Sequence, residues 1–126
     1  MKLHLKAITI GVVAYVGILS VHFILTALLP EYVNWRTFFG LNVVLILTGI
    51  VSGYSTGRLA AGSGLMNAAM VAIIGALFLP LFELRFGASS YDGIVGYLHA
   101  AAYGLLKPGI LCCIAGSVGD FHARKA

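Results

Sequence analysis

The sequence predicts an all-α polytopic membrane protein: a single domain built as a bundle of four transmembrane helices. Of its 126 residues, 60% are hydrophobic and only 10% are charged, whereas about 25% of the residues of a soluble domain are charged. The length favours one domain, and the few charges leave long intervals with no Asp, Glu, Lys or Arg. This composition excludes an ordinary soluble enzyme, a disordered chain and a small disulfide-rich secreted scaffold.

The charge-free intervals place the first three helices. A helix needs ~20 apolar residues to cross a hydrocarbon core ~30 Å thick. The intervals 7–30, 37–57 and 59–82 contain 24, 21 and 24 residues. They are continuously apolar, and backbone amides in lipid must be paired internally, so helices are favoured. The predicted helices are about 7–29, 38–58 and 65–82, with Pro80 near the end of the third.

A fourth helix is predicted over 93–119, where two shorter intervals, 93–106 and 108–119, flank Lys107. Pro108 lacks a backbone donor and Gly109 adds conformational freedom, so we expect a kink or a break at this point. Two separate pieces, 93–106 and 109–119, are the alternative to one continuous helix.

Basic residues predict the orientation. Five Lys and Arg side chains fall on the side of the two termini and the second loop, and two fall on the other side. The positive-inside rule therefore places both termini in the cytoplasm. The first apolar run is longer than the core of a signal peptide, so we expect it to be retained as a span. No basic patch large enough for nucleic acid is present.

Small residues recur at every fourth position on the second and third predicted helices. Residues four apart share a helix face, and small ones let two backbones approach closely in lipid. We interpret these rows as packing faces inside the bundle; self-association into a homo-oligomer along one of them is the alternative. The residues are Gly49, Gly53 and Gly57, followed by Gly64, Ala68 and Ala72.

The hairpin formed by the second and third predicted helices resembles part of a known group of proteins. Gly53-x-x-x-Gly57-Arg58-x-Ala60, followed by Asn67-Ala68, resembles small four-helix bacterial inner-membrane proteins of uncharacterised function. In these proteins a helix ending Gly-x-x-x-Gly-Arg-x-Ala turns into one that opens with Asn-Gly or Asn-Ala. The resemblance implies a four-helix topology and a location in the bacterial inner membrane, and it implies no reaction.

Two histidines fall inside predicted spans. His22 lies eight residues before Pro30 and His99 seven residues after Asp92, so both are expected ~10 Å below the outer surface on antiparallel helices. Such histidines usually bond neighbouring hydroxyls or carbonyls, and we predict no cofactor. The alternative is an electron carrier in which His22 and His99 are the axial ligands of a b-type haem.

Lys107 is the third ionisable group inside a span. His99, Tyr103 and Lys107 follow one another at spacings of four, which places them on one helix face, and Ser52 is expected at a depth similar to that of Lys107. An ionisable side chain at membrane depth is a functional hypothesis by default. These four residues are candidates for a polar cavity in a small channel or transporter. Lys107 is otherwise explained by a helix break or by a partner protein's carboxylate.

Catalytic signatures are missing from the sequence. It contains no nucleotide-binding loop, nucleophile elbow, zinc signature or paired carboxylates. We therefore predict a small, non-enzymatic inner-membrane protein that acts as an accessory or self-associating unit. Its expected partners are the lipid bilayer and either further copies of the chain or another membrane protein.

Overall fold

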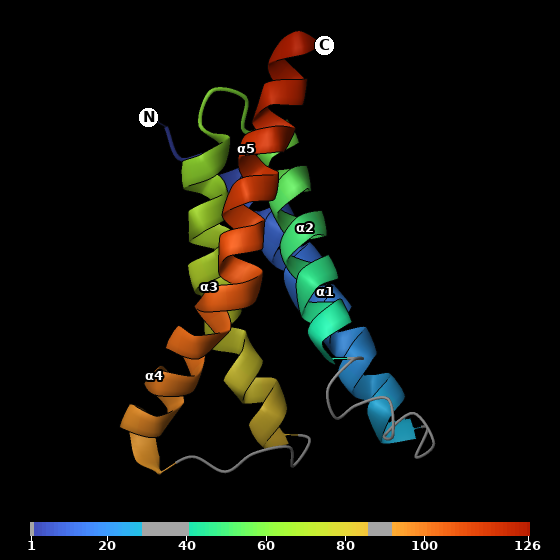
Figure 1. The fold of residues 1–126 in the computed structure, drawn as a ribbon, viewed down its shortest axis with the longest axis vertical. Coiled ribbons are helices and arrows are strands. Elements are labelled where there is room, and N and C mark those ends of the chain that lie inside the picture. The colour runs from blue at the N-terminus through green and yellow to red at the C-terminus, as the bar shows by residue number, and fades with distance from the viewer. Residues whose placement is uncertain (1, 29–40, 86–91) are drawn as a thin grey trace.

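The computed structural model describes residues 2–28, 41–85 and 92–126, and this part of the chain is helical and contains no strand. Helices α1 (Leu5–Leu28), α2 (Leu41–Leu59) and α3 (Gly64–Arg85) are followed by a fourth rod in three segments. These segments are α4 (Gly93–Gly104), the π-helical turn η3 (Leu105–Gly109) and α5 (Ile110–Lys125). The prediction of an all-α chain with four helices is confirmed (Figure 1).

Three helix ends differ from the prediction by more than one residue. Helix α3 continues to Arg85, beyond its predicted end at 82, and α5 continues to Lys125, beyond the predicted end of the fourth helix at 119. Pro80 lies inside α3. Pro80 removes a single intrahelical bond, the one to the carbonyl of Ala76, and the flanking turns keep theirs. Helix α1 begins at Leu5, two residues earlier than expected. Residues 38–40 of the predicted second helix lie outside the described residues.

The fourth rod bends without breaking. Pro108 lies inside η3, and the chain stays helical from Gly93 to Lys125. A single π turn is a common way for a helix to accommodate an extra residue or a disrupted hydrogen bond. Figure 1 shows α4 leaning away from the direction of α5 at this turn. The expected bend is therefore present, and the alternative of two separate pieces is not.

Both termini and the α2–α3 turn lie at one end of the molecule, which we call the terminal end (Figure 1). The most extensive packing is between α5 and α2, and α5 also packs on α3. Helix α1 packs on α2 and α3, whereas α4 packs on α3. Within the fourth rod, α5 therefore lies at the centre of the bundle, whereas α4 lies at its edge.

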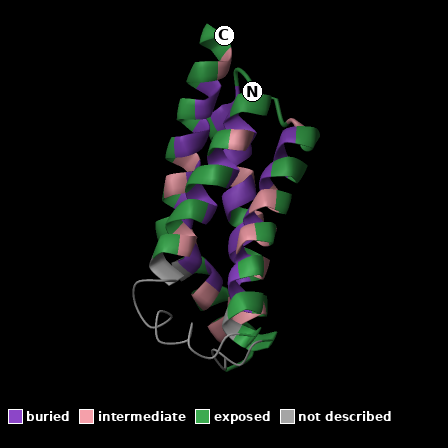
Figure 2. Cartoon of the chain, turned by 90° about the vertical axis from the view of Figure 1, so that its right-hand side faces the viewer, coloured by how far each residue is buried: buried purple, intermediate pink, exposed green. Residues whose placement is uncertain are grey.

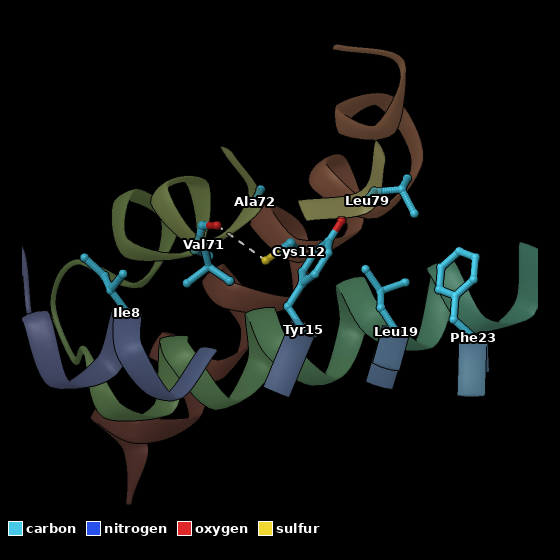
Figure 3. Close-up of a cluster of buried hydrophobic side chains, with 9 residues drawn as sticks. Ile8, Tyr15, Leu19, Phe23, Val71, Ala72, Leu79 and Cys112 are labelled. Atoms are coloured by element: carbon cyan, nitrogen blue, oxygen red, sulfur yellow. Dashed lines mark hydrogen bonds between the residues drawn. The ribbon is translucent and has the colours of Figure 1, made fainter. Parts of the chain in front are cut away.

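The core is formed by side chains of α1, α3 and α5 (Figure 3). Tyr15 and Leu19 of α1 are fully buried, together with Val71 of α3 and Cys112 of α5. The ring of Tyr15 lies on the backbone of Gly75, where an added Cβ would stand only 2.7 Å from ring carbons. Glycine is therefore required at position 75 for α1 to approach α3 this closely.

The outer surface of the bundle is apolar. Figure 2 shows buried positions turned inward and exposed positions outward along every helix, and the exposed positions include many large hydrophobic residues. Within the described residues, three stretches are long and apolar enough to cross a membrane: Leu5–Leu25, Gly64–Arg85 and Gly93–Lys125. The apolar part of α2, Val43–Leu59, is shorter.

Candidate functional site

Glycines of α2 bring its backbone against the backbone of α5. An added Cβ would lie 2.6 Å from the carbonyl oxygen of Pro108 at Gly49, 2.1 Å from that of Cys112 at Gly53 and 2.0 Å from that of Gly116 at Gly57. No side chain fits at such distances. This row of α2 is therefore occupied by α5 of the same chain.

The small residues of α3 meet the same helix. An added Cβ at Gly64 would lie 2.6 Å from the carbonyl oxygen of Gly116, and one at Gly116 would lie 2.3 Å from Ala68. Ala72, also buried, lies beside Gly109. The two predicted packing rows thus both face α5, so neither is open for self-association unless α5 is displaced.

The packing of α5 on α2 and α3 places Lys107 on the outside of the bundle. Pro108 and Cys112 face α2, and adjacent helical residues point about 100° apart. Lys107 is accordingly exposed on the outside of the bundle, between Leu106 (57% exposed) and Ile110 (54%).

The expected polar cavity is not assembled. Ser52 is fully buried between α2 and α5, whereas His99 and Lys107 are both exposed. The side chain of Tyr103 lies outside the described part of the structure. The physical reason is the packing described above, because the close contact of α2 with α5 directs Cys112, and not Lys107, toward Ser52. Any anion pathway past Lys107 would therefore run along the outside of this bundle.

The hydroxyls of α2 are satisfied locally. Ser52 donates to the carbonyl of Thr48, and Thr56 donates to the carbonyl of Ser52 at 2.6 Å. The Ser52 oxygen also lies 3.7 Å from the sulfur of Cys112, whose thiol donates to the carbonyl of Ala68 at 3.4 Å (dashed line in Figure 3). Bonds to the preceding turn are the usual solution for Ser and Thr inside apolar helices.

His22 and His99 are not brought together. His22 is buried on α1, edge-on to Phe23 with ring centroids 5.4 Å apart, and Phe23 stacks on Phe82 of α3. His99 is exposed on α4, which packs on α3. A haem clamp needs both imidazoles inward on neighbouring helices, and the described residues do not provide that arrangement. Nor do three His, Cys, Asp or Glu side chains gather anywhere in the described ranges in a way that suits a metal ion.

A buried carboxylate organises the terminal end, and the sequence analysis did not identify it. Asp120 is 5% exposed and accepts hydrogen bonds from the backbone N–H groups of Gly62 (2.6 Å) and Gly64 (3.1 Å). Arg124 donates to the same carboxylate through Nε (2.8 Å) and Nη2 (2.7 Å). Asp120 thus caps the start of α3 from another helix, where backbone donors lack partners and negative charge is favoured.

The electrostatics of this cap favour the charged carboxylate. The 33 residues from Gly93 to Lys125 extend ~50 Å, more than the ~30 Å of a hydrocarbon core, so a bilayer around their apolar middle would leave Asp120 outside the core. Hydrogen bonds from Arg124, and then from Gly62 and Gly64, hold the pKa of Asp120 well below its usual range, against the opposing effect of burial. The spacing of four between Asp120 and Arg124 was the available sequence signal.

Asn67 is a second anchor at the terminal end. Its side chain is fully buried, its Oδ1 accepts the backbone N–H of His4 at 2.7 Å, and its Nδ2 donates to the carbonyls of Lys2 (3.2 Å) and Ser63 (2.8 Å). The asparagine of the hairpin motif therefore holds the beginning of α1 against the start of α3.

No family model, no curated protein and no solved structure matches this chain.

Proposed function

We propose that this chain is a non-enzymatic inner-membrane protein that crosses the bilayer four times, with both termini in the cytoplasm, and serves as an accessory subunit of another membrane protein. Apolar helices, an apolar outer surface and the gathering of both termini at one end support the topology. Most Lys and Arg residues also belong to that end, as the positive-inside rule requires of a cytoplasmic face.

One observation carries the accessory role: Lys107 is exposed in the middle of an apolar segment on the peripheral part of the bundle. Ionisable side chains at membrane depth are rare and are functional-site candidates by default. The glycine rows of α2 and α3 are already occupied by α5. The outer face of α4 and η3 is therefore the surface that an associated protein would cover.

Site-specific photocrosslinking in the living cell tests this role. A photoreactive residue at Leu106, beside Lys107, is compared with one at Val13 on α1, which is similarly exposed (57% and 65%). We expect a discrete crosslinked species from position 106 and none from position 13. Crosslinks to lipid alone at both positions would reject the accessory role.

The topology is tested separately with reporter enzymes fused to each terminus. A reporter that works only in the cytoplasm should be active at both ends of the chain. Activity of a periplasm-dependent reporter at either terminus would contradict the proposed orientation.

A further inference from the structure

We infer that the outer side of the α2–α5 contact, at the terminal end, binds the phosphate headgroup of an anionic phospholipid. The inference goes beyond the accessory role and rests only on the proposed membrane location. Basic and aromatic side chains from both helices form the site, which we call the basic cluster. Its members are Tyr54 and Arg58 of α2 and His122 and Lys125 of α5.

The close packing of α2 on α5 brings the members of the basic cluster together. An added Cβ at Gly119 of α5 would stand 2.4 Å from the carbonyl oxygen of Tyr54 and 2.9 Å from the backbone nitrogen of Arg58. The hydroxyl of Tyr54 lies 3.1 Å from Nδ1 of His122, and the two ring centroids are 5.8 Å apart. Because His122 follows Gly119 by three residues, it lies within about one helical turn of Arg58.

The ammonium of Lys125 is directed back toward the same level. Its Nζ lies 4.2 Å from the ring centroid of Phe121, which belongs to the preceding turn of α5. Phe121 is 54% exposed, so this cation–π contact lies on the outer surface of the bundle. Lys125 therefore adds its charge near the level of His122 and Arg58, and not beyond the end of the helix.

Apolar side chains continue the basic cluster toward the middle of the bundle. On α2, Val51 lies seven residues before Arg58, and on α5, Val118 lies four residues before His122 and Ile114 four residues before Val118. These spacings place them on the same helix faces as the cluster, and Val51, Val118 and Ile114 are all exposed. A phospholipid has the same order, with a phosphate above apolar chains. A phosphate at the cluster would therefore place its acyl chains against these three side chains.

The charge of the basic cluster complements an anionic headgroup. Arg58 and Lys125 are exposed, and Asp120 is the only acidic residue of α2 and α5. Asp120 faces the start of α3, where it accepts hydrogen bonds from the backbone of Gly62 and Gly64. A bilayer around the apolar middle of the fourth rod would leave this level among the headgroups, where lipid phosphate is the abundant anion.

Fluorescence quenching by brominated lipids tests the site in a bilayer. Trp35, the single tryptophan of the chain, is removed by Trp35→Phe, and Phe121→Trp supplies a reporter that keeps an aromatic ring beside Lys125. Leu5→Trp, at an exposed position at the beginning of α1, supplies a control reporter at the same end. The protein is reconstituted into vesicles of phosphatidylcholine and phosphatidylglycerol, with bromine on the acyl chains of one lipid at a time. The ratio of the two quenching efficiencies gives the lipid preference beside each reporter.

We expect phosphatidylglycerol to be preferred at position 121 by about twentyfold, because each Lys or Arg near an anionic surface contributes about fivefold. The double variant Arg58→Gln/Lys125→Gln should remove this preference and leave quenching of the reporter at position 5 unchanged. The matched control Lys2→Gln/Lys6→Gln makes the same change of charge on α1 and should keep the preference at position 121.

An unchanged preference in Arg58→Gln/Lys125→Gln, or an equal loss in Lys2→Gln/Lys6→Gln, would overturn the inference. The first result would exclude the basic cluster from lipid binding, and the second would show a general attraction by the charged end. Displacement of phosphatidylglycerol from position 121 by inorganic phosphate would indicate a site for free phosphate and would also overturn it. Quenching by both lipids without preference would reject the lipid site and support the membrane location, whereas no quenching of either reporter would reject both.

Discussion

The backbone of Gly53 lies so close to Cys112 that a methyl group on Gly53 would stand 2.1 Å from the carbonyl oxygen of Cys112. Gly49, Gly53 and Gly57, which are spaced four residues apart on α2, each make such a contact with the backbone of α5. Helix association in lipid depends on such close packing, because the hydrophobic effect does not favour contact between apolar helices there. The α2–α5 contact is thus the part of the fold most sensitive to added volume.

Gly53→Ala should therefore strongly destabilise the bundle. The methyl group would meet backbone atoms of Cys112, which cannot rotate away as a side chain does. We expect the free energy of unfolding to fall by about 3 kcal/mol, as for overpacked cores. The measurement is reversible denaturation in mixed micelles.

Gly17→Ala is the matched control. It replaces a glycine in the middle of α1 that has no atom within 4 Å of the added methyl. It should leave stability unchanged or raise it by up to about 1 kcal/mol through helix propensity. Equal effects of the two substitutions would contradict the proposed contact between α2 and α5.

The Asp120 cap should contribute more to stability than its partner Arg124. Asp120→Asn keeps the shape but removes the charge that accepts the N–H groups of Gly62 and Gly64, so we expect a loss of about 2 kcal/mol. Arg124 is 61% exposed, and exposed ion pairs contribute little. Arg124→Gln should thus have the smaller effect on the thermal midpoint. The opposite order would show that the arginine, and not the backbone amides, accounts for the contribution of the carboxylate.

Stability should also depend on pH through Asp120. Its pKa is lowered in the folded protein, chiefly by the hydrogen bonds from Arg124, so the folded state binds the proton less readily than the unfolded state. The stabilisation is complete above the usual pKa of an aspartate, ~3.9, and is lost as the pH falls below that value toward the folded-state pKa. The difference in thermal midpoint between wild type and Asp120→Asn should be constant from pH 5 to 7 and shrink below pH 4. A difference that persists undiminished at pH 2 would contradict this linkage.

The sequence predicts the helices well because charge-free length determines where a chain can span lipid. It predicts their partners less well. The rows of small residues on α2 and α3 suggest that these two helices pack on each other, yet both rows pack on α5. The residues of α5 that they contact are Pro108, Cys112, Gly116 and Asp120. Because this set includes a proline and an acid, it does not stand out in the sequence as a row of small residues. A row of small residues identifies a face that packs closely, not the helix that it meets.

The outward position of Lys107 could not be predicted from the sequence either. Whether a residue next to a proline faces inward depends on how the helix passes that proline, and a π turn changes the rotation of everything that precedes it. The sequence predicts a distortion at Pro108, but it does not predict which residues on either side of this proline face the bundle. The cap formed by Asp120 could not be predicted from local spacing, because its partners Gly62 and Gly64 lie more than fifty residues away in the sequence.

Asn67→Ala should release the beginning of the chain. The substitution leaves the backbone N–H of His4 and the carbonyl of Lys2 without their partner, and removing one side of a buried hydrogen bond costs about 2 kcal/mol. We expect the amide of His4 to exchange with solvent faster in the variant, and a protease to cleave the N-terminal residues more readily. The neighbouring variant Met66→Ala, at a half-buried position on the same helix, should leave the exchange rate of this amide unchanged. If both variants accelerated exchange equally, general loosening of α3 would explain the effect, and Asn67 would not be the specific anchor between α1 and α3.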